Sequence, residues 1–157
     1  MIAGGTGLTP MIQIIRAILR NTADKTTITL IYANVNSQDI LLKDDLDQLV
    51  NNHSSQFKLF YVLNNPPPGW DGGVGFVTKD HINDHLQNPS SSNSKLLMCG
   101  PPPMITAMKK NLADLSYPLP NTISKLPDKV STSSVRPFHG LTFFQGLCFL
   151  ILDLGYI

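Results

Sequence analysis

The apolar positions of this chain fall into segments with two different periods. The helical spacing i, i+3, i+4, i+7, i+8 occurs at Met11, Ile14, Ile15, Ile18 and Leu19. It predicts a helix with one buried face. Thr9 and Pro10 stand directly before it and are predicted to be its N-cap and its first helical residue.

Further along the chain, segments of strand length alternate with amphipathic helices. The predicted strands are Thr27–Ala33, Phe57–Leu63 and Lys95–Cys99, and the turn Asn64–Gly69 follows the second. Helical spacing returns at Leu42, Leu46, Leu49 and Val50, in Thr78–Leu86 behind a Thr78 cap, and at Ile105, Met108, Leu112 and Leu115. The alternation predicts an α/β fold, with a parallel sheet covered by helices on both faces. Ligands of such sheets bind at the carboxyl ends of the strands.

A glycine-rich turn, Gly4–Pro10, falls at one predicted strand end. Glycines let the backbone approach an anion closely, and the helix N-terminus behind them suits a phosphate. Pro10 stands where the full dinucleotide fingerprint has its third glycine, so a plain glycine turn is the alternative. Because only Met1–Ala3 precede the turn, we expect the chain to start inside its first strand, at an internal methionine of a longer protein.

A second turn, Gly100–Pro103, follows Cys99 at the end of another predicted strand. Its prolines make the turn rigid. A cysteine at this position would lie at the ligand-binding edge of the sheet. The alternative is a buried core cysteine, which is the commoner fate of a cysteine.

Two further features favour structural roles. His81 and His85 have a spacing that could bind a metal, but no third ligand accompanies them, so we predict a solvated helix face and no metal site. Trp70 lies beside Pro66–Pro68 and could stack on a ligand. We favour an aromatic anchor that holds its loop on the domain.

Composition narrows the function classes. The 157 residues suffice for one domain, and 12 basic against 11 acidic residues leave a formal net charge of +1. This balance argues against nucleic-acid binding and against a polybasic membrane patch. Cys99 and Cys148 are too few for a disulfide framework. The apolar run Leu147–Leu152 ends at Asp153 and is too short for a transmembrane segment.

Four segments resemble NADH–cytochrome b5 reductase in order and spacing: Met1–Leu19, Asp39–Leu42, Gly75–Val77 and Leu97–Met104. Gly-Gly-Thr-Gly-x-Thr-Pro together with Cys-Gly-Pro-Pro-Pro-Met is highly specific, whereas either alone indicates only the ferredoxin-reductase-like superfamily. The resemblance covers residues 1–130 and implies a three-layer, Rossmann-like NAD-binding domain there, with its first strand truncated. Residues 131–157 resemble nothing in the family, and we interpret them as an atypical, poorly ordered extension produced by a misread splice junction or a frameshift.

The resemblance also implies roles for individual residues. Gly4, Gly5, Thr6 and Gly7 would line the pyrophosphate and nicotinamide region, and Thr9 would touch a flavin held by a neighbouring domain. Cys99, with Thr6, would place the nicotinamide for reaction, and Gly100, Pro101, Pro102 and Met104 would complete that wall. Phe76 and Asn64 would also bind the cofactor. The family often has an acidic residue where this chain has Asn64, which leaves the choice between NADH and NADPH open.

The implied function is the NADH-binding part of an FAD enzyme that passes a hydride from NADH to FAD and then electrons to cytochrome b5 or a similar haem protein. The flavin-binding barrel and the N-terminal anchor of the family do not precede Met1, so we expect the chain alone to be inactive. The full-length family lies on the cytosolic face of the endoplasmic reticulum or on the mitochondrial outer membrane. The alternatives are the reductase part of a relative such as nitrate reductase, and a non-catalytic nucleotide-binding fragment.

Overall fold

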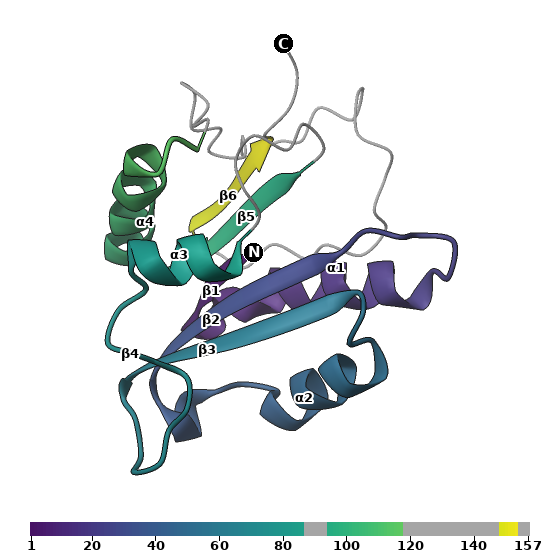
Figure 1. Cartoon of the computed structure of the whole chain (residues 1–157), viewed down its shortest axis with the longest axis horizontal. Coiled ribbons are helices and arrows are strands. Elements are labelled where there is room, and N and C mark those ends of the chain that lie inside the picture. The colour runs from purple at the N-terminus through teal and green to yellow at the C-terminus, as the bar shows by residue number, and fades with distance from the viewer. Residues whose placement is uncertain (87–93, 118–147, 154–157) are drawn as a thin grey trace.

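The computed structural model describes residues 1–86 and 94–117, and the backbone of residues 148–153 (Figure 1). Its strands are β1 (Ile2–Gly4), β2 (Ile28–Asn36), β3 (Phe57–Asn65), β4 (Gly73–Val74), β5 (Lys95–Gly100) and β6 (Cys148–Asp153). Its helices are α1 (Leu8–Arg20), α2 (Lys43–Asn52), α3 (Lys79–His85) and α4 (Pro102–Asp114). Short 3₁₀ turns at Gly5–Gly7 and Ser37–Asp39 lead from β1 and β2 toward α1 and α2.

Within the described residues, the strands form one sheet in the order β4-β3-β2-β1-β5-β6. The pairs among β1 to β5 are parallel, and β6 runs antiparallel to β5. The chain leaves β1 for β2 on one side and later returns to β5 on the other side of β1. Such a reversal of strand order opens a crevice at the carboxyl edge, where ligands of α/β sheets bind.

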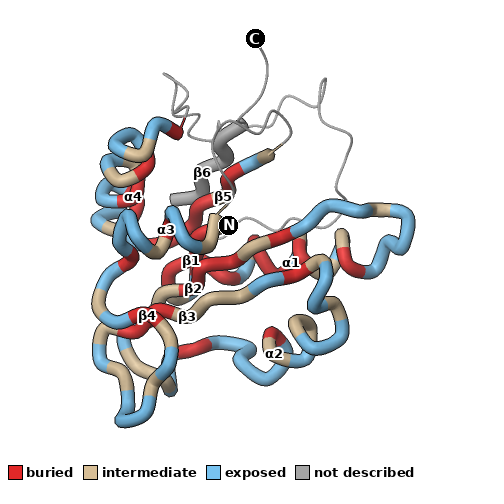
Figure 2. Tube along the Cα trace, viewed as in Figure 1, coloured by how far each residue is buried: buried red, intermediate tan, exposed pale blue. Residues whose placement is uncertain are grey.

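Helices cover both faces of the sheet, because side chains along each strand alternate between two apolar clusters. One cluster joins Ile31 and Val62 to Ile82 of α3 and Met108 of α4. The other joins strand side chains such as Leu30 to α1 and α2. The buried stretches in Figure 2 accordingly follow the central strands and the inner sides of the helices. The prediction of a three-layer, Rossmann-like α/β fold is confirmed.

The first helix differs from its prediction in start and in face. It begins at Leu8 with Gly7 as N-cap, so Thr9 and Pro10 are its second and third residues. The 3₁₀ turn Gly5–Gly7 runs directly into the helix, and Pro10 fits in the first turn because its missing N–H would have no partner within the helix. Ile12 is buried instead of the predicted Ile14, which is only half-buried.

Strands β2 and β3 are longer than predicted, and each carries asparagines at its carboxyl end. Asn36 pairs with Asn65 in the parallel ladder, so Asn64 and Asn65 belong to β3 rather than to the following turn. Backbone pairing with β2 keeps these polar residues extended, although their side chains favour turns.

The C-terminal part of the chain is described only in its last strand. β6 pairs with β5 with Cys99 opposite Phe149. The remainder of the predicted extension at 131–157 lies outside the described residues, as does much of the stretch before it, and the boundary at residue 130 stays a prediction. None of the helices among the described residues has the length and apolar character needed to cross a membrane.

Candidate dinucleotide-binding site

The glycine turn of residues 4–7 packs directly against the end of β5. Gly5 has a φ of +52°, a backbone conformation that glycine adopts without strain. Gly7 lies against the Cys99 carbonyl, which a Cβ atom at position 7 would overlap. The two turns that the sequence placed at separate strand ends therefore touch each other, and glycine at position 7 is required by this contact.

Met104 closes the same corner from α4. Its sulfur lies where a Cβ atom on Gly4 would stand, and a Cβ atom on Gly100 would come within 3.0 Å of it. Pro101 is the N-cap of α4 and also approaches Gly4. The structure thus brings together six of the predicted site positions: Gly4, Gly7, Cys99, Gly100, Pro101 and Met104.

The N-terminus of α1 suits a phosphate better than that of α4. No side chain caps the turn Gly5–Gly7 or α1, and no acidic residue lies in the first turn of α1. The Thr9 hydroxyl instead donates to the Thr6 carbonyl at 3.0 Å. In α4, Pro102 and Pro103 supply no N–H groups to the first turn. The N-terminal end of α1, where the helix dipole favours an anion, is therefore the better phosphate site of this corner, and its Leu8 amide already donates to the Gly5 and Thr6 carbonyls.

The Cys99 side chain does not lie at the surface where a ligand would contact it. Its side chain is fully buried in the cluster beneath α1, together with Ala3 and Met11. Its carbonyl, not its thiol, faces Gly7. Placement of a nicotinamide by Cys99 remains a prediction, and in this geometry the residue would act through the position of its backbone.

Asn64 and Phe76 lie at the outer part of the same carboxyl edge. Asn64 is half-buried near the end of β3, and Leu63 before it pairs with Val74 of β4. Gly75 then turns the chain with a φ of +85° and is followed by Phe76, which is 78% exposed. An aromatic ring so exposed at a strand end is available to a flat ligand group.

Tyr32 and Asn34 at the end of β2 were not predicted as site residues. The Tyr32 hydroxyl donates to the Gly5 carbonyl at 3.1 Å and accepts from the Leu41 amide at 3.3 Å, which ties the glycine turn to the loop before α2. Burial raises the pKa of Tyr32, and the Leu41 amide and Asn34 partly offset this shift. Asn34 is the buried polar residue among the described residues. The sequence feature that could have indicated Asn34 is a polar residue at a strand position whose side chain faces the apolar core.

An apolar groove runs beside this corner. It has a volume of about 220 Å³ and is lined by Leu8, Thr9, Ile12, Leu41 and Leu42. Leu41 and Leu42 are 45% and 46% exposed. Leu42 also has a φ of +54°, which is uncommon for a leucine and orients the chain into α2.

The two histidines of α3 do not form the solvated face that we predicted. The His85 ring stacks on Phe60 with ring centres 3.7 Å apart, and the His81 ring lies 5.5 Å from the same phenyl ring. His81 also accepts a hydrogen bond from the Thr78 amide, which completes the cap of α3. No group of three potential metal ligands occurs within residues 1–86 and 94–117.

Trp70 anchors its loop, as predicted. Its ring packs 6.3 Å from that of Tyr61, and its Nε1 donates to the Gly73 carbonyl at 3.1 Å. It therefore holds the proline-rich loop against the sheet instead of lying open to a ligand.

Residues 1–110 match the family described as the oxidoreductase NAD-binding domain. The chain belongs to this family. The glycine turn at the strand-order reversal is thus part of an NAD-binding domain, and the resemblance to NADH–cytochrome b5 reductase is confirmed by its relatives.

Those relatives include NADH-cytochrome b5 reductase 1 of Laccaria bicolor, which is 72% identical over 83% of this chain and 42% of the relative. The protein of the same name from Mortierella alpina is 58% identical over 83% of this chain and 43% of the relative. The chain spans less than half the length of these curated relatives.

Solved structures show the same likeness. The cytochrome b5 reductase domain of Ulva prolifera nitrate reductase has 41% identity and a TM-score of 0.73, over 78% of this chain and 45% of that chain. The CS-b5R domains of human Ncb5or in the NAD+ form have 25% identity and a TM-score of 0.62, over 74% of this chain and 33% of that chain.

Proposed function

We propose that this NAD-binding domain is the NADH half of a flavin-dependent reductase of the cytochrome b5 reductase type. The observation that carries the proposal is the contact between Gly7 and the Cys99 carbonyl, which joins the two turns that we predict to bind the ligand, at the strand-order reversal. The 72% identity to a protein named NADH-cytochrome b5 reductase 1 supports the assignment.

The residues present fit a dinucleotide. Glycine at positions 4 and 7 lets the turn pack directly against Met104 and the Cys99 carbonyl, and the uncapped N-terminus of α1 behind the turn would favour a pyrophosphate. Thr6 would bind beside the pyrophosphate, while Met104 and Pro101 would limit the movement of the nicotinamide. Phe76 and Asn64 would take the adenosine end, because they lie farther out along the same edge.

FAD would be held mainly by a neighbouring domain, where it would accept the hydride of NADH and release electrons singly to cytochrome b5 or a similar haem protein. The contribution of this chain would be to orient the nicotinamide and exclude water.

We propose that the flavin domain docks on the groove lined by Leu41 and Leu42. Three observations support this choice: the groove is apolar, Thr9 lies in it, and the match covers only 42% of the length of a curated relative.

In this proposal, the reductase activity and the cellular location are properties of the longer protein. The chain alone would bind NADH and would not reduce a haem protein. The longer protein would be anchored at the cytosolic face of the endoplasmic reticulum or at the mitochondrial outer membrane. A reductase domain within a nitrate reductase is the second candidate, favoured by the 41% identity to the Ulva prolifera structure.

A fusion experiment tests the proposal. The part of the Laccaria bicolor relative that this chain does not match is joined to the N-terminus of the chain, and NADH-dependent reduction of cytochrome b5 is measured. We expect the fusion to hold FAD and to be active, and the chain alone to hold no FAD. Leu42→Glu in the fusion should lower the rate, while Ala23→Glu, exposed between α1 and β2 at the opposite edge of the sheet, should not. A fusion that holds FAD but does not oxidise NADH would contradict the proposed function.

A further inference from the structure

Asn34 has a buried side-chain amide without a hydrogen-bond partner. Its side chain is 7% exposed, and neither Oδ1 nor Nδ2 forms a hydrogen bond within the described residues. The amide lies near enough to the Tyr32 hydroxyl to lower the pKa of that phenol, against the larger rise caused by burial, but neither amide atom forms a hydrogen bond. Nearly all buried polar groups of folded proteins have partners, so such an amide calls for a specific explanation.

The position of Asn34 in the sheet places it at the dinucleotide corner. Ala33 pairs with Gly4, so Asn34 is level with Gly5 at the start of the glycine turn. Side chains alternate along β2, which puts Asn34 on the same face as Tyr32, whose hydroxyl reaches the Gly5 carbonyl. Asn34 therefore lies on the face that carries α1, near the Tyr32 hydroxyl that joins the glycine turn to the Leu41 amide.

The cost of this arrangement argues for a role outside the stability of the domain. A buried amide that has lost its water and found no partner destabilises the folded state, and an apolar side chain of the same shape would not. The position opposite Asn34 on β3 carries the buried Leu63, so an apolar side chain would fit the packing there. The asparagine is therefore explained best by a partner that arrives with a ligand.

We propose that Asn34 is a positioning residue of the dinucleotide site, whose amide hydrogen-bonds a ribose hydroxyl of the bound NADH. A hydroxyl both donates and accepts, so it satisfies Oδ1 and Nδ2 together, whereas a phosphate oxygen only accepts. Asn34 thereby complements the backbone N–H groups of the glycine turn, which serve the pyrophosphate. This inference rests on the proposed function and adds a residue that the resemblance did not assign.

The test compares ligand affinity with the stability of the unliganded protein. NADH binding to the whole 157-residue chain is measured by fluorescence titration, and thermal unfolding is followed without ligand. Asn34→Leu should weaken NADH binding about tenfold, because two hydrogen bonds are lost. The same variant should melt at the same temperature as the unchanged chain, or about 3 °C higher, because an unpartnered buried amide is removed.

Controls keep the outcomes distinct. Asn65→Leu makes the same substitution at an exposed asparagine of β3 and should leave NADH affinity within twofold. If Asn34→Leu does not fold, Asn34→Asp keeps the shape but removes the donor and adds a charge that repels the phosphates, and should also weaken binding at least about tenfold.

Two results would overturn the inference. NADH affinity within twofold of the unchanged chain in the Asn34 variants would show that the amide does not contact the ligand. A lower melting temperature with unchanged affinity would show that the amide has a structural partner such as a buried water. If the unchanged chain binds no NADH, the proposed function itself fails, and this inference fails with it.

Discussion

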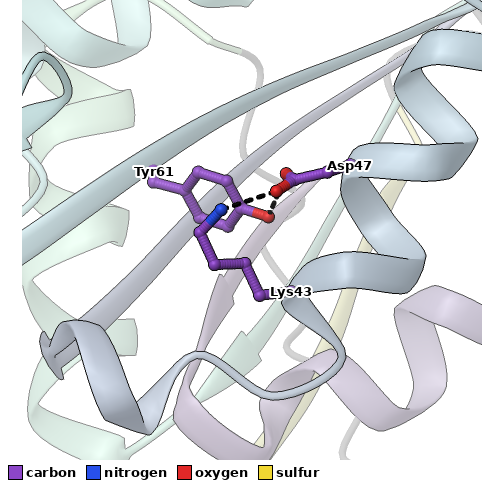
Figure 3. Close-up of polar contacts among 3 residues, drawn as sticks. All are labelled: Lys43, Asp47 and Tyr61. Atoms are coloured by element: carbon purple, nitrogen blue, oxygen red, sulfur yellow. Dashed lines mark hydrogen bonds and ion pairs between the residues drawn. The ribbon is translucent and has the colours of Figure 1, made fainter.

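Tyr61 in β3 donates a hydrogen bond of 2.9 Å to the Asp47 carboxylate in α2 (Figure 3). Lys43, one helical turn before Asp47, contacts the same carboxylate at 2.5 Å, and its Nζ lies 5.5 Å from the centre of the Tyr61 ring. Burial of the phenol, and then its bond to the negative Asp47, raise the pKa of Tyr61 far above its ordinary value. The three side chains tie α2 to the sheet, and α2 in turn supports the loop that carries Leu41 and Leu42.

Tyr61→Phe tests this tie. We expect it to lower the free energy of unfolding by about 1 kcal/mol at pH 7.5, because it removes a hydrogen bond to a charged, partly buried group. The pKa of a tyrosine in the unfolded chain is about 10. A phenol whose pKa is raised in the folded state contributes its full stabilisation of the fold below that pH, and this contribution falls as the pH rises beyond it. The unchanged chain should therefore lose more stability than Tyr61→Phe between pH 9 and 11.

Urea unfolding at several pH values measures both effects of Tyr61→Phe. Lys43→Met is the matched control, since it removes the exposed ion pair and the ammonium near the Tyr61 ring but keeps the Tyr61–Asp47 hydrogen bond, and it should change the free energy of unfolding by less than about 0.5 kcal/mol. Equal stability of Tyr61→Phe and the unchanged chain at every pH would show that the hydrogen bond does not hold α2.

Gly7→Ala tests the contact between the two turns. A Cβ atom at position 7 overlaps backbone atoms of Cys99, which cannot rotate away as a side chain could. We expect a loss of about 1–3 kcal/mol in the free energy of unfolding, together with weaker NADH binding, because the turn must move away from β5. Thermal unfolding and NADH titration measure the two effects.

Gly69→Ala is the control for Gly7→Ala. Gly69 has a φ of +79°, but a Cβ atom there would meet no other atom within 4 Å. This variant should therefore cost only its backbone strain, about 1 kcal/mol, with NADH affinity unchanged. Equal effects of the two alanines on NADH binding would count against a role of the Gly7 contact in the site.

Protonation of His85 should lower the stability of the folded chain at acidic pH. Burial against Phe60 lowers the pKa of His85, while Asp84 raises it and His81 lowers it further. A histidine with a lowered pKa in the folded state binds fewer protons than in the unfolded chain. Its contribution is therefore complete above about pH 6.5 and decreases as the pH falls below that value.

The variant His85→Phe keeps a ring on Phe60 but cannot be protonated. We expect its stability to fall less than that of the unchanged chain between pH 7.5 and 5.5, as measured by urea unfolding. His53→Gln, at the C-cap of α2 and away from Phe60, serves as the comparison and should keep the full acid-side loss. The same slope in all three proteins would show that His85 does not cause it.

Asn64→Asp tests the choice between NADH and NADPH. If Asn64 lies beside the adenosine ribose, a carboxylate there should repel the extra phosphate of NADPH and reduce its affinity about tenfold, with less than a twofold change for NADH. Titration with both dinucleotides gives the ratio of the two dissociation constants. Asn65→Asp places the same charge one residue later, so an equal shift of that ratio in both variants would mean that the charge acts at long range.

The sequence by itself determined most of the order and type of the elements and predicted the edge at which a ligand would bind, but it indicated neither the short β4 nor the antiparallel β6. The spacing of Met11, Ile15 and Leu19 predicts α1, and the strand before Gly100 predicts β5, because helices and strands bury side chains at different local periods. The glycine turn could also be found in the sequence, because the glycines that it needs lie close together at positions 4, 5 and 7.

Only the tertiary structure decided which side chains meet. It placed the Cys99 thiol beneath α1 and its carbonyl against Gly7, and it laid His81 and His85 on Phe60 rather than in solvent. It also left the Asn34 amide buried without a partner beside the glycine turn. These facts depend on the register of parallel strands and on the packing of segments distant in sequence, and neither leaves a local pattern in the chain.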